Sequence, residues 1–183
     1  MMIRTFIALE IPQDILDEII TIRNNMVPSY QSIKWESSDK LHVTLKFLGE
    51  TEQENIEKIF ASLEKLSTKY HKFDLQLDRF GFFKSNGVPR ILWAGLKENF
   101  ELENFVKEID ILCSEFGFEK EKRKFKPHIT MLRIKNESII KEVNSLDNYR
   151  LPQLKFVGNK IIMFQSILTK GGSIYKPIKS LLL

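Results

Sequence analysis

The sequence contains a single cysteine and no long hydrophobic run. Cys113 cannot form an internal disulfide, which fits a reducing compartment, so we expect a cytoplasmic protein. No apolar run approaches the roughly 20 residues of a membrane-spanning helix, and we expect no membrane partner. The first 12 residues have a short apolar run, then Glu10 and no small-residue cleavage site. They predict a strand over residues 3–10 and not a secretory signal.

Strong charge and low-complexity segments are also missing. The chain has 183 residues, a net charge of +4 and 43% hydrophobic residues. This net charge is only weak evidence for an anionic partner. Most of the lysines are scattered through predicted helices, where they ordinarily lie on the solvated face. No linker divides the chain, so we expect one domain over residues 1–183.

The apolar periodicity predicts strands that alternate with helices. A helix follows Pro12, a second helix begins at a capping box formed by Thr51 and Glu54, and Gly117 stops a third. The further predicted segments are a strand ended by Gly49, strands at 73–77, 90–96 and around 128, a turn at 85–87, helices at 100–116 and 137–146, one or two strands in 154–170, and a turn at 171–175.

The order of elements repeats within the chain. Strand, helix, histidine-containing strand, helix and strand follow one another from residue 3 and again from residue 90. Three pairs of identical residues stand 86 positions apart: His42 and His128, Thr44 and Thr130, Ala8 and Ala94. A spacing of about half the chain suggests two related lobes, although the two halves share little other sequence.

Two of the three histidines occur in the same pattern, His-x-Thr within a strand. Residues i and i+2 of a strand point to the same face. In the stretch 41–46, the residues Leu41, Val43 and Leu45 alternate with His42, Thr44 and Lys46, and the stretch 128–131 alternates in the same way. Each strand is therefore expected to present an imidazole and a hydroxyl side by side, away from the core.

Two imidazoles and two hydroxyls around one cleft suit phosphoester chemistry without a metal. Imidazole takes or gives a proton near neutral pH, and two of them can act as base and acid. Threonine hydroxyls can donate hydrogen bonds to the phosphate oxygens on which charge accumulates in the transition state. The simpler alternative is that each histidine is only a packed or surface residue, because such short patterns also arise by chance.

Other kinds of site fit the sequence less well. A metal site needs three or four ligands, and neither histidine strand carries a carboxylate or cysteine beside its histidine. Cys113 lies on the apolar stripe of its helix, where a buried, unreactive thiol is expected. His71 has no threonine partner, and we expect it in a solvated loop.

Taken together, these motifs resemble the 2H phosphoesterase superfamily, and within it the RNA 2′,3′-cyclic phosphodiesterases, also called 2′–5′ RNA ligase-like proteins. The resemblance covers nearly the whole chain. It is carried by RTFIAL at 4–9, Trp35, LHVTLKFLG at 41–49, PRILWAG at 89–95, GF at 117–118, FKPHITMLR at 125–133, and the segment from Ser166 through Gly172 to Tyr175. The run ESSDK at 36–40 departs from relatives that carry prolines there.

The resemblance implies an α+β fold of two pseudo-symmetric lobes, each an antiparallel sheet with outer helices, and an active-site groove between them. It implies hydrolysis of RNA 2′,3′-cyclic phosphate ends, or of cyclic nucleotides, to 2′-phosphomonoesters, with no metal and no cofactor. His42 maps to the acid and His128 to the base. Thr44 and Thr130 map to phosphate-binding hydroxyls, and Arg133 to a residue near the substrate. Reversible 2′–5′ ligation of RNA ends is a variant of the same chemistry.

A different class of function is a non-catalytic module that binds RNA or nucleotides. Retention of both histidines and both threonines favours the enzyme, because a pure binder would not need them. Phenylalanines near the motifs are candidates for stacking on a base, although core packing is their default. These are Phe80, Phe82, Phe83 and Phe125. A monomer is the default expectation.

Overall fold

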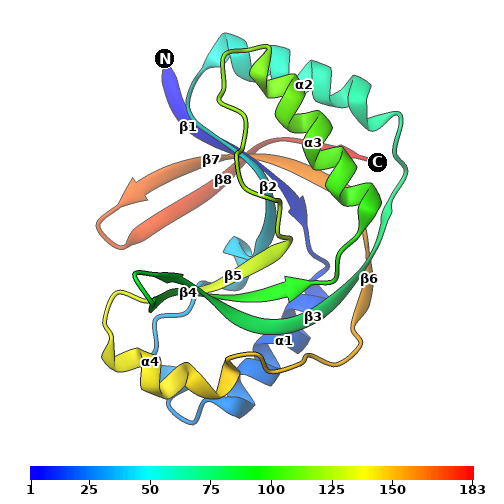
Figure 1. The fold of residues 1–183 in the computed structure, drawn as a ribbon. Coiled ribbons are helices and arrows are strands. Elements are labelled where there is room, and N and C mark those ends of the chain that lie inside the picture. The colour runs from blue at the N-terminus through cyan, green and yellow to red at the C-terminus, as the bar shows by residue number, and fades with distance from the viewer.

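Eight antiparallel strands form one strongly curved sheet in the computed structural model, which describes residues 1–183 (Figure 1). The strand order is β6-β3-β4-β5-β2-β1-β7-β8. The strands are β1 (Met2–Glu10), β2 (His42–Glu52), β3 (Phe73–Ser85), β4 (Val88–Leu96), β5 (His128–Arg133), β6 (Lys155–Gly158), β7 (Lys160–Thr169) and β8 (Gly172–Leu182). The helices are α1 (Gln13–Met26), α2 (Gln53–Ser67), α3 (Phe100–Ser114) and α4 (Ser138–Val143).

The sheet consists of two halves that meet where β2 runs beside β5. The pairing across this junction is short and centres on Val43 and Ile129. Helices α2 and α3 cover the outer face of the half that contains β1, β2, β7 and β8, whereas α1 and α4 lie on the other half (Figure 1). The expected α+β fold, with antiparallel strands and outer helices, is confirmed. Helix α3 follows β4 in the chain yet contacts β2, so the helices tie the two halves together.

The apolar stripes of the helices form the core, as their periodicity predicts. Thirty-nine buried residues form a single hydrophobic cluster. Helix α2 buries Ile56, Ile59 and Leu63 almost completely, and each such side chain stabilises the fold by roughly 1.5–3 kcal/mol. Cys113 of α3 has no exposed surface, as expected for a structural thiol.

The predicted capping box at Thr51 is wrong. Strand β2 continues past Gly49, which adopts φ +73°, and pairs with β1 as far as Glu52. Thr51 is therefore a buried strand residue, and its hydroxyl lies 2.8 Å from that of Thr5. Pairing with the long first strand outweighs the local capping signal, and helix α2 begins after Glu52 without a side-chain cap.

The hairpin turns agree better with the sequence. Asn86 and Gly87 both have positive φ, at 50° and 77°, which is the geometry of a two-residue hairpin with the twist that strands prefer. Strand β3 extends from the predicted 73–77 to Ser85. The turn predicted at 171–175 is shorter and occupies 170–171, because β8, which was not foreseen, begins at Gly172. Strand β8 forms the outer edge of the sheet beside β7.

Candidate active site

Both histidine strands contain a β-bulge one residue after the threonine. Between β1 and β2 the register skips Leu45, because Thr44 faces Ala8 and Lys46 already faces Ile7. Between β4 and β5 the register skips Met131 in the same manner. A bulge adds one residue to one strand and thereby exchanges the faces of all residues that follow.

The bulges decide which side chains reach the concave face of the sheet. Strict alternation would place residues 46 and 132 beside the threonines, but the extra residue returns Phe47 and Arg133 to that face instead. These two positions are again 86 apart. One half of the sheet thus supplies an aromatic ring, and the other half a guanidinium group, at matching places.

One cavity of about 150 Å³ brings the predicted residues together. Both histidines, both threonines and Arg133 line it, from β2 on one side and β5 on the other. The full lining is Glu36, Lys40, His42, Thr44, Phe47, Phe83, Ile91, His128, Thr130, Arg133 and Tyr175. The junction between the two halves of the sheet is therefore also where the candidate chemistry lies.

Each imidazole is oriented by the backbone carbonyl two residues before it. His128 Nδ1 lies 2.7 Å from the carbonyl oxygen of Lys126, and His42 has a backbone hydrogen bond with Lys40. A carbonyl only accepts, so the His128 Nδ1 carries the proton and its Nε2 is the free nitrogen of the neutral ring. His42 Nε2 lies 3.2 Å from the hydroxyl of Thr44.

Aromatic side chains hold the two imidazoles in place. The His42 ring stacks on Phe6 at a centroid distance of 5.0 Å, and Tyr175 meets it edge-on at 5.5 Å. The His128 ring meets Phe83 at 4.8 Å and nearly perpendicular. Neither ring can turn without losing these contacts, which favours a fixed geometry for proton transfer.

Burial keeps both imidazoles neutral near pH 7. The pKa of His42 is lowered to about 4, chiefly by desolvation; the hydrogen bond with Lys40 opposes this shift, and repulsion from Arg133, and from His128 when that ring is protonated, contributes to it. Desolvation also lowers the pKa of His128, again against a backbone hydrogen bond, here with Lys126. In the free protein the site therefore holds two bases, and a proton must accompany the substrate if one ring is to act as an acid.

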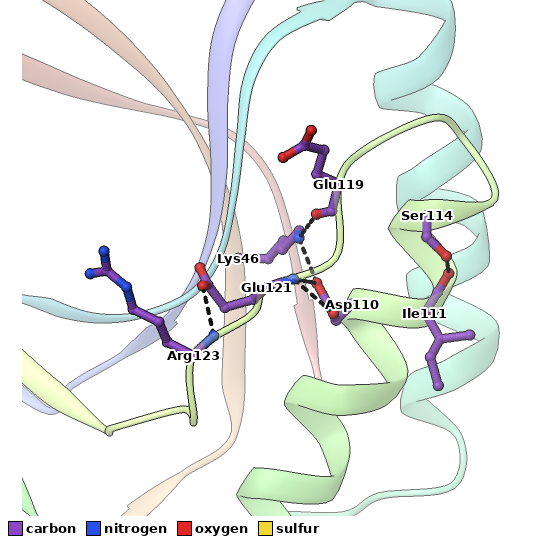
Figure 2. Close-up of polar contacts among 7 residues, drawn as sticks. All are labelled: Lys46, Asp110, Ile111, Ser114, Glu119, Glu121 and Arg123. Atoms are coloured by element: carbon purple, nitrogen blue, oxygen red, sulfur yellow. Dashed lines mark hydrogen bonds and ion pairs between the residues drawn. The ribbon is translucent and has the colours of Figure 1, made fainter.

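Lys46 does not share the face of His42, contrary to the alternation in the sequence. The bulge at Leu45 turns it to the opposite side, where only 8% of the residue is exposed. Its Nζ lies 2.5 Å from Asp110 Oδ1 of α3 and 2.6 Å from the Glu119 carbonyl oxygen (Figure 2). Lys46 thus connects the first histidine strand with the loop that leads to the second.

Sequence reasoning missed several residues at the mouth of the cavity. Glu36 Oε1 lies 3.5 Å from Arg133 Nε, and Glu36 Oε2 lies 3.9 Å from Lys40 Nζ. The backbone N–H of Glu36 donates to the carbonyl of Met131, the bulged residue of β5. Lys40 could have been predicted from the sequence, because it precedes His42 by two residues, just as Lys126 precedes His128.

The phenylalanines that are candidates for stacking on a base lie in different environments. Phe83 lines the cavity, whereas Phe80 is fully buried in the core and is not available to a base. Phe82 and Phe125 are partly buried and pack against the core. Phe47 and Tyr175, which were not candidates, line the cavity, and Phe47 is 62% exposed.

The remaining candidates lie away from the cavity. His71 is an exposed loop residue, as predicted. Burial raises the pKa of the Cys113 thiol to about 12, so it is not a nucleophile at neutral pH. Nowhere in the chain do three or more His, Cys, Asp or Glu side chains gather in a metal-binding group. None of the helices combines the length and hydropathy needed to cross a bilayer.

The sequence matches the model of a known family, described as LigT like Phosphoesterase, over residues 9–93 and 95–175. The chain is 32% identical over 180 residues to an RNA 2′,3′-cyclic phosphodiesterase of Methanocaldococcus jannaschii, covering 96% of this chain and 98% of the relative. A protein of the same description from Thermotoga maritima is 28% identical over 180 residues, covering 96% and 92%.

Solved structures share the fold. A Thermus thermophilus protein superposes with a TM-score of 0.80 at 22% identity, covering 98% of this chain and 97% of that one. Escherichia coli LigT in complex with 3′-AMP gives a TM-score of 0.75 at 24% identity, covering 100% and 99%.

Proposed function

The chain belongs to the LigT-like phosphoesterase family, and we propose that it hydrolyses RNA 2′,3′-cyclic phosphodiester ends to 2′-phosphomonoesters without a metal ion. The observation that carries the proposal is the meeting of two imidazoles and two threonine hydroxyls in one cavity. The relatives named RNA 2′,3′-cyclic phosphodiesterase support the substrate class.

The reaction assigns one role to each group. His128 takes a proton from water, and the water oxygen attacks phosphorus. The bond between phosphorus and the 3′ oxygen breaks, and His42 gives its proton to that oxygen. The products are a 2′-phosphomonoester and a 3′-hydroxyl. Strain in the five-membered cyclic ester makes phosphorus reactive, and two positioned acid–base groups each contribute about 10²- to 10⁴-fold.

The hydroxyls and Arg133 stabilise the charge that develops on the phosphate. Thr44 and Thr130 donate hydrogen bonds to the two non-bridging oxygens, one from each half of the sheet. Arg133, 47% exposed on its side chain, supplies a positive charge at the rim. Glu36 shares this guanidinium in the free protein, so an arriving phosphate competes with a carboxylate that lies 3.5 Å away.

The phosphate also explains how His42 becomes an acid. Burial, together with repulsion from the positive charge of Arg133, lowers its pKa to about 4 in the free protein. A bound phosphodiester brings a negative charge next to the ring, and this charge raises the pKa by favouring the imidazolium. His128, whose pKa is lowered as well, remains available as the base. Substrate binding thus divides the two roles.

Turnover of a cyclic-ended oligonucleotide in EDTA tests the proposal. His42→Ala and His128→Ala are expected to lower kcat by about 10²- to 10⁴-fold, and Thr44→Val and Thr130→Val by about 10²-fold. His71→Ala is the matched control, because it removes the exposed third histidine and should leave turnover unchanged. Loss of activity in EDTA would contradict metal independence, and a 3′-phosphate product would contradict the assigned leaving oxygen.

Two other outcomes point to other functions. Wild-type protein that binds cyclic-ended RNA without turnover is a binding module and not an enzyme. The same cavity also accommodates attack by a 5′-hydroxyl in place of water, which joins two RNA ends through a 2′–5′ bond. Cleaved tRNA halves distinguish hydrolysis from ligation, because only ligation restores the full-length strand.

A further inference from the structure

The loop that precedes His128 concentrates positive charge between helix α3 and the second histidine strand. Residues 119–126 contain five basic and two acidic residues and form no helix or strand. A charged loop on a protein surface is ordinarily mobile. This loop is exposed, but specific contacts hold its backbone.

Specific contacts fix the backbone of the loop at several points. Asp110 of α3 accepts from the Glu121 N–H with both carboxylate oxygens, each at 3.1 Å, and buried Lys46 holds the Glu119 carbonyl (Figure 2). At the far end the Lys126 carbonyl lies 2.7 Å from His128 Nδ1. The loop is therefore anchored at both ends to the two histidine strands.

Most of the positive side chains of the loop have no carboxylate partner. Lys124 is paired with Glu98 at 2.7 Å. Lys120, Lys122 and Arg123 are exposed and form no ion pair, and Figure 2 shows the Arg123 guanidinium extending away from α3. A fixed backbone that displays three unpaired cations is preorganised for an anionic partner, because little ordering remains to be done on binding.

Lys126 links these cations to the cavity. Its ammonium group lies 5.1 Å from the ring centroid of Trp93 and 5.7 Å from that of Phe83. Phe83 in turn lines the cavity and contacts the His128 ring. The last cation of the loop therefore lies against the wall of the cavity, and the other cations precede it in the chain.

We infer that this loop, through Lys120, Lys122 and Arg123, binds the phosphates of the RNA strand that continues from the terminal nucleotide. Six residue steps from 120 to 126 span at most about 20 Å, which is enough for several nucleotides of an extended single strand. Such contacts read no bases and scale with the number of phosphates. The inference rests on the proposed function and adds to it a preference for oligonucleotides over mononucleotides.

The test compares two substrates on one variant. The variant Lys120→Gln/Lys122→Gln/Arg123→Gln removes three charges and keeps the backbone contacts of the loop. For a ten-nucleotide RNA with a 2′,3′-cyclic end, kcat/KM is expected to fall on the order of tenfold, chiefly through KM. The salt dependence of kcat/KM should weaken by a slope of about 2, because three contacts to a single strand each contribute about 0.7. A 2′,3′-cyclic mononucleotide should be turned over as by the wild type.

The matched control removes three exposed, unpaired lysines elsewhere. Lys65→Gln/Lys107→Gln/Lys155→Gln changes the net charge equally at α2, α3 and β6, and should leave the salt slope unchanged. Equal losses in both triple variants, or an equal loss on mononucleotide and oligonucleotide, would overturn the inference. If the wild type turns over neither substrate, the proposed function fails. Fluorescence anisotropy with a 2′-phosphate-ended RNA then still tests the loop, which must bind it more weakly in the first variant than in the control.

Discussion

Replacing Lys46 by methionine separates the contribution of a buried ion pair from that of an exposed one. Lys46 and Asp110 approach to 2.5 Å, with side-chain exposures of 8% and 17%. Lys58 and Glu54 on α2 approach to 2.6 Å, but their side chains are 54% and 73% exposed. The two distances are nearly equal, so any difference in stability comes from burial and from the Glu119 carbonyl that Lys46 also contacts.

The expected cost follows from what the substitution leaves behind. Removing one partner of a buried ion pair costs about 3–5 kcal/mol, because the other charge stays in a poor environment. Asp110 keeps two hydrogen bonds from the Glu121 N–H and some contact with water, so we expect about 3 kcal/mol for Lys46→Met. This corresponds to a fall in Tm of roughly 6–12 °C for a chain of this size. Lys58→Met should cost under about 0.5 kcal/mol.

Urea unfolding monitored by the fluorescence of Trp35 and Trp93 measures both variants. The double variant Lys46→Met/Asp110→Asn retains an acceptor for Glu121 and removes the unpaired charge, so it should recover at least about 1 kcal/mol relative to the sum of the single variants. Equal costs for the Lys46 and Lys58 variants would refute the reasoning. So would additivity of the two substitutions in the double variant.

Three further predictions concern the titrating groups and the packing around them. The pH profile of kcat/KM should be bell-shaped, with both limbs below pH 6.5. Burial lowers the pKa of His42, the acid, to about 4, and it also lowers the pKa of His128, the base. A value of kcat/KM that still rises between pH 7 and 8 would contradict this. Gly81→Ala should destabilise the protein by about 1–3 kcal/mol in urea unfolding, because the added Cβ would lie 2.5 Å from Trp93 Cζ2. Gly171→Ala is the neutral control, because its added Cβ would have its nearest neighbour at 3.7 Å. Cys113 should resist a thiol reagent in the native protein and react fully in urea, since burial raises its pKa to about 12; rapid native labelling would show that α3 opens.

Periodicity predicted the elements that carry strong local patterns. The helix stripes, the Asn86–Gly87 hairpin and the buried position of Cys113 needed no knowledge of long-range contacts. The errors arose where a distant partner decides. Thr51 has a good local signature for a helix cap, yet pairing of β2 with β1 extends the strand through it. Strand β8 lies at the edge of the sheet and is half exposed, so its sequence shows no clear alternation.

The candidate site was predictable where the sequence repeats and unpredictable where the loops converge. Strands position the histidines and threonines, and their repeated spacing predicted that they share one cavity, which they line. Glu36 reaches that cavity because its backbone N–H donates to the carbonyl of Met131, a contact between segments about 95 positions apart. Tyr175 reaches it through the edge hairpin formed by β7 and β8. Neither contact produces a periodic pattern in the sequence, so periodicity could not predict it.

The paired bulges show how a small backbone irregularity shapes the site. If β2 and β5 alternated strictly through Leu45 and Met131, with no bulge, Lys46 would face the cavity and Arg133 would turn away from it. Lys46 would then bring its positive charge next to the two imidazoles, and Asp110 would lose its partner. The bulge in β2 therefore places Lys46 in a structural ion pair, and the bulge in β5 places Arg133 in the lining of the cavity. Deleting Leu45 would remove this bulge and leave Lys46 directly after Thr44, still on the opposite face. The Lys46–Asp110 coupling energy should therefore persist in that deletion variant, and its loss would refute this account of the bulge.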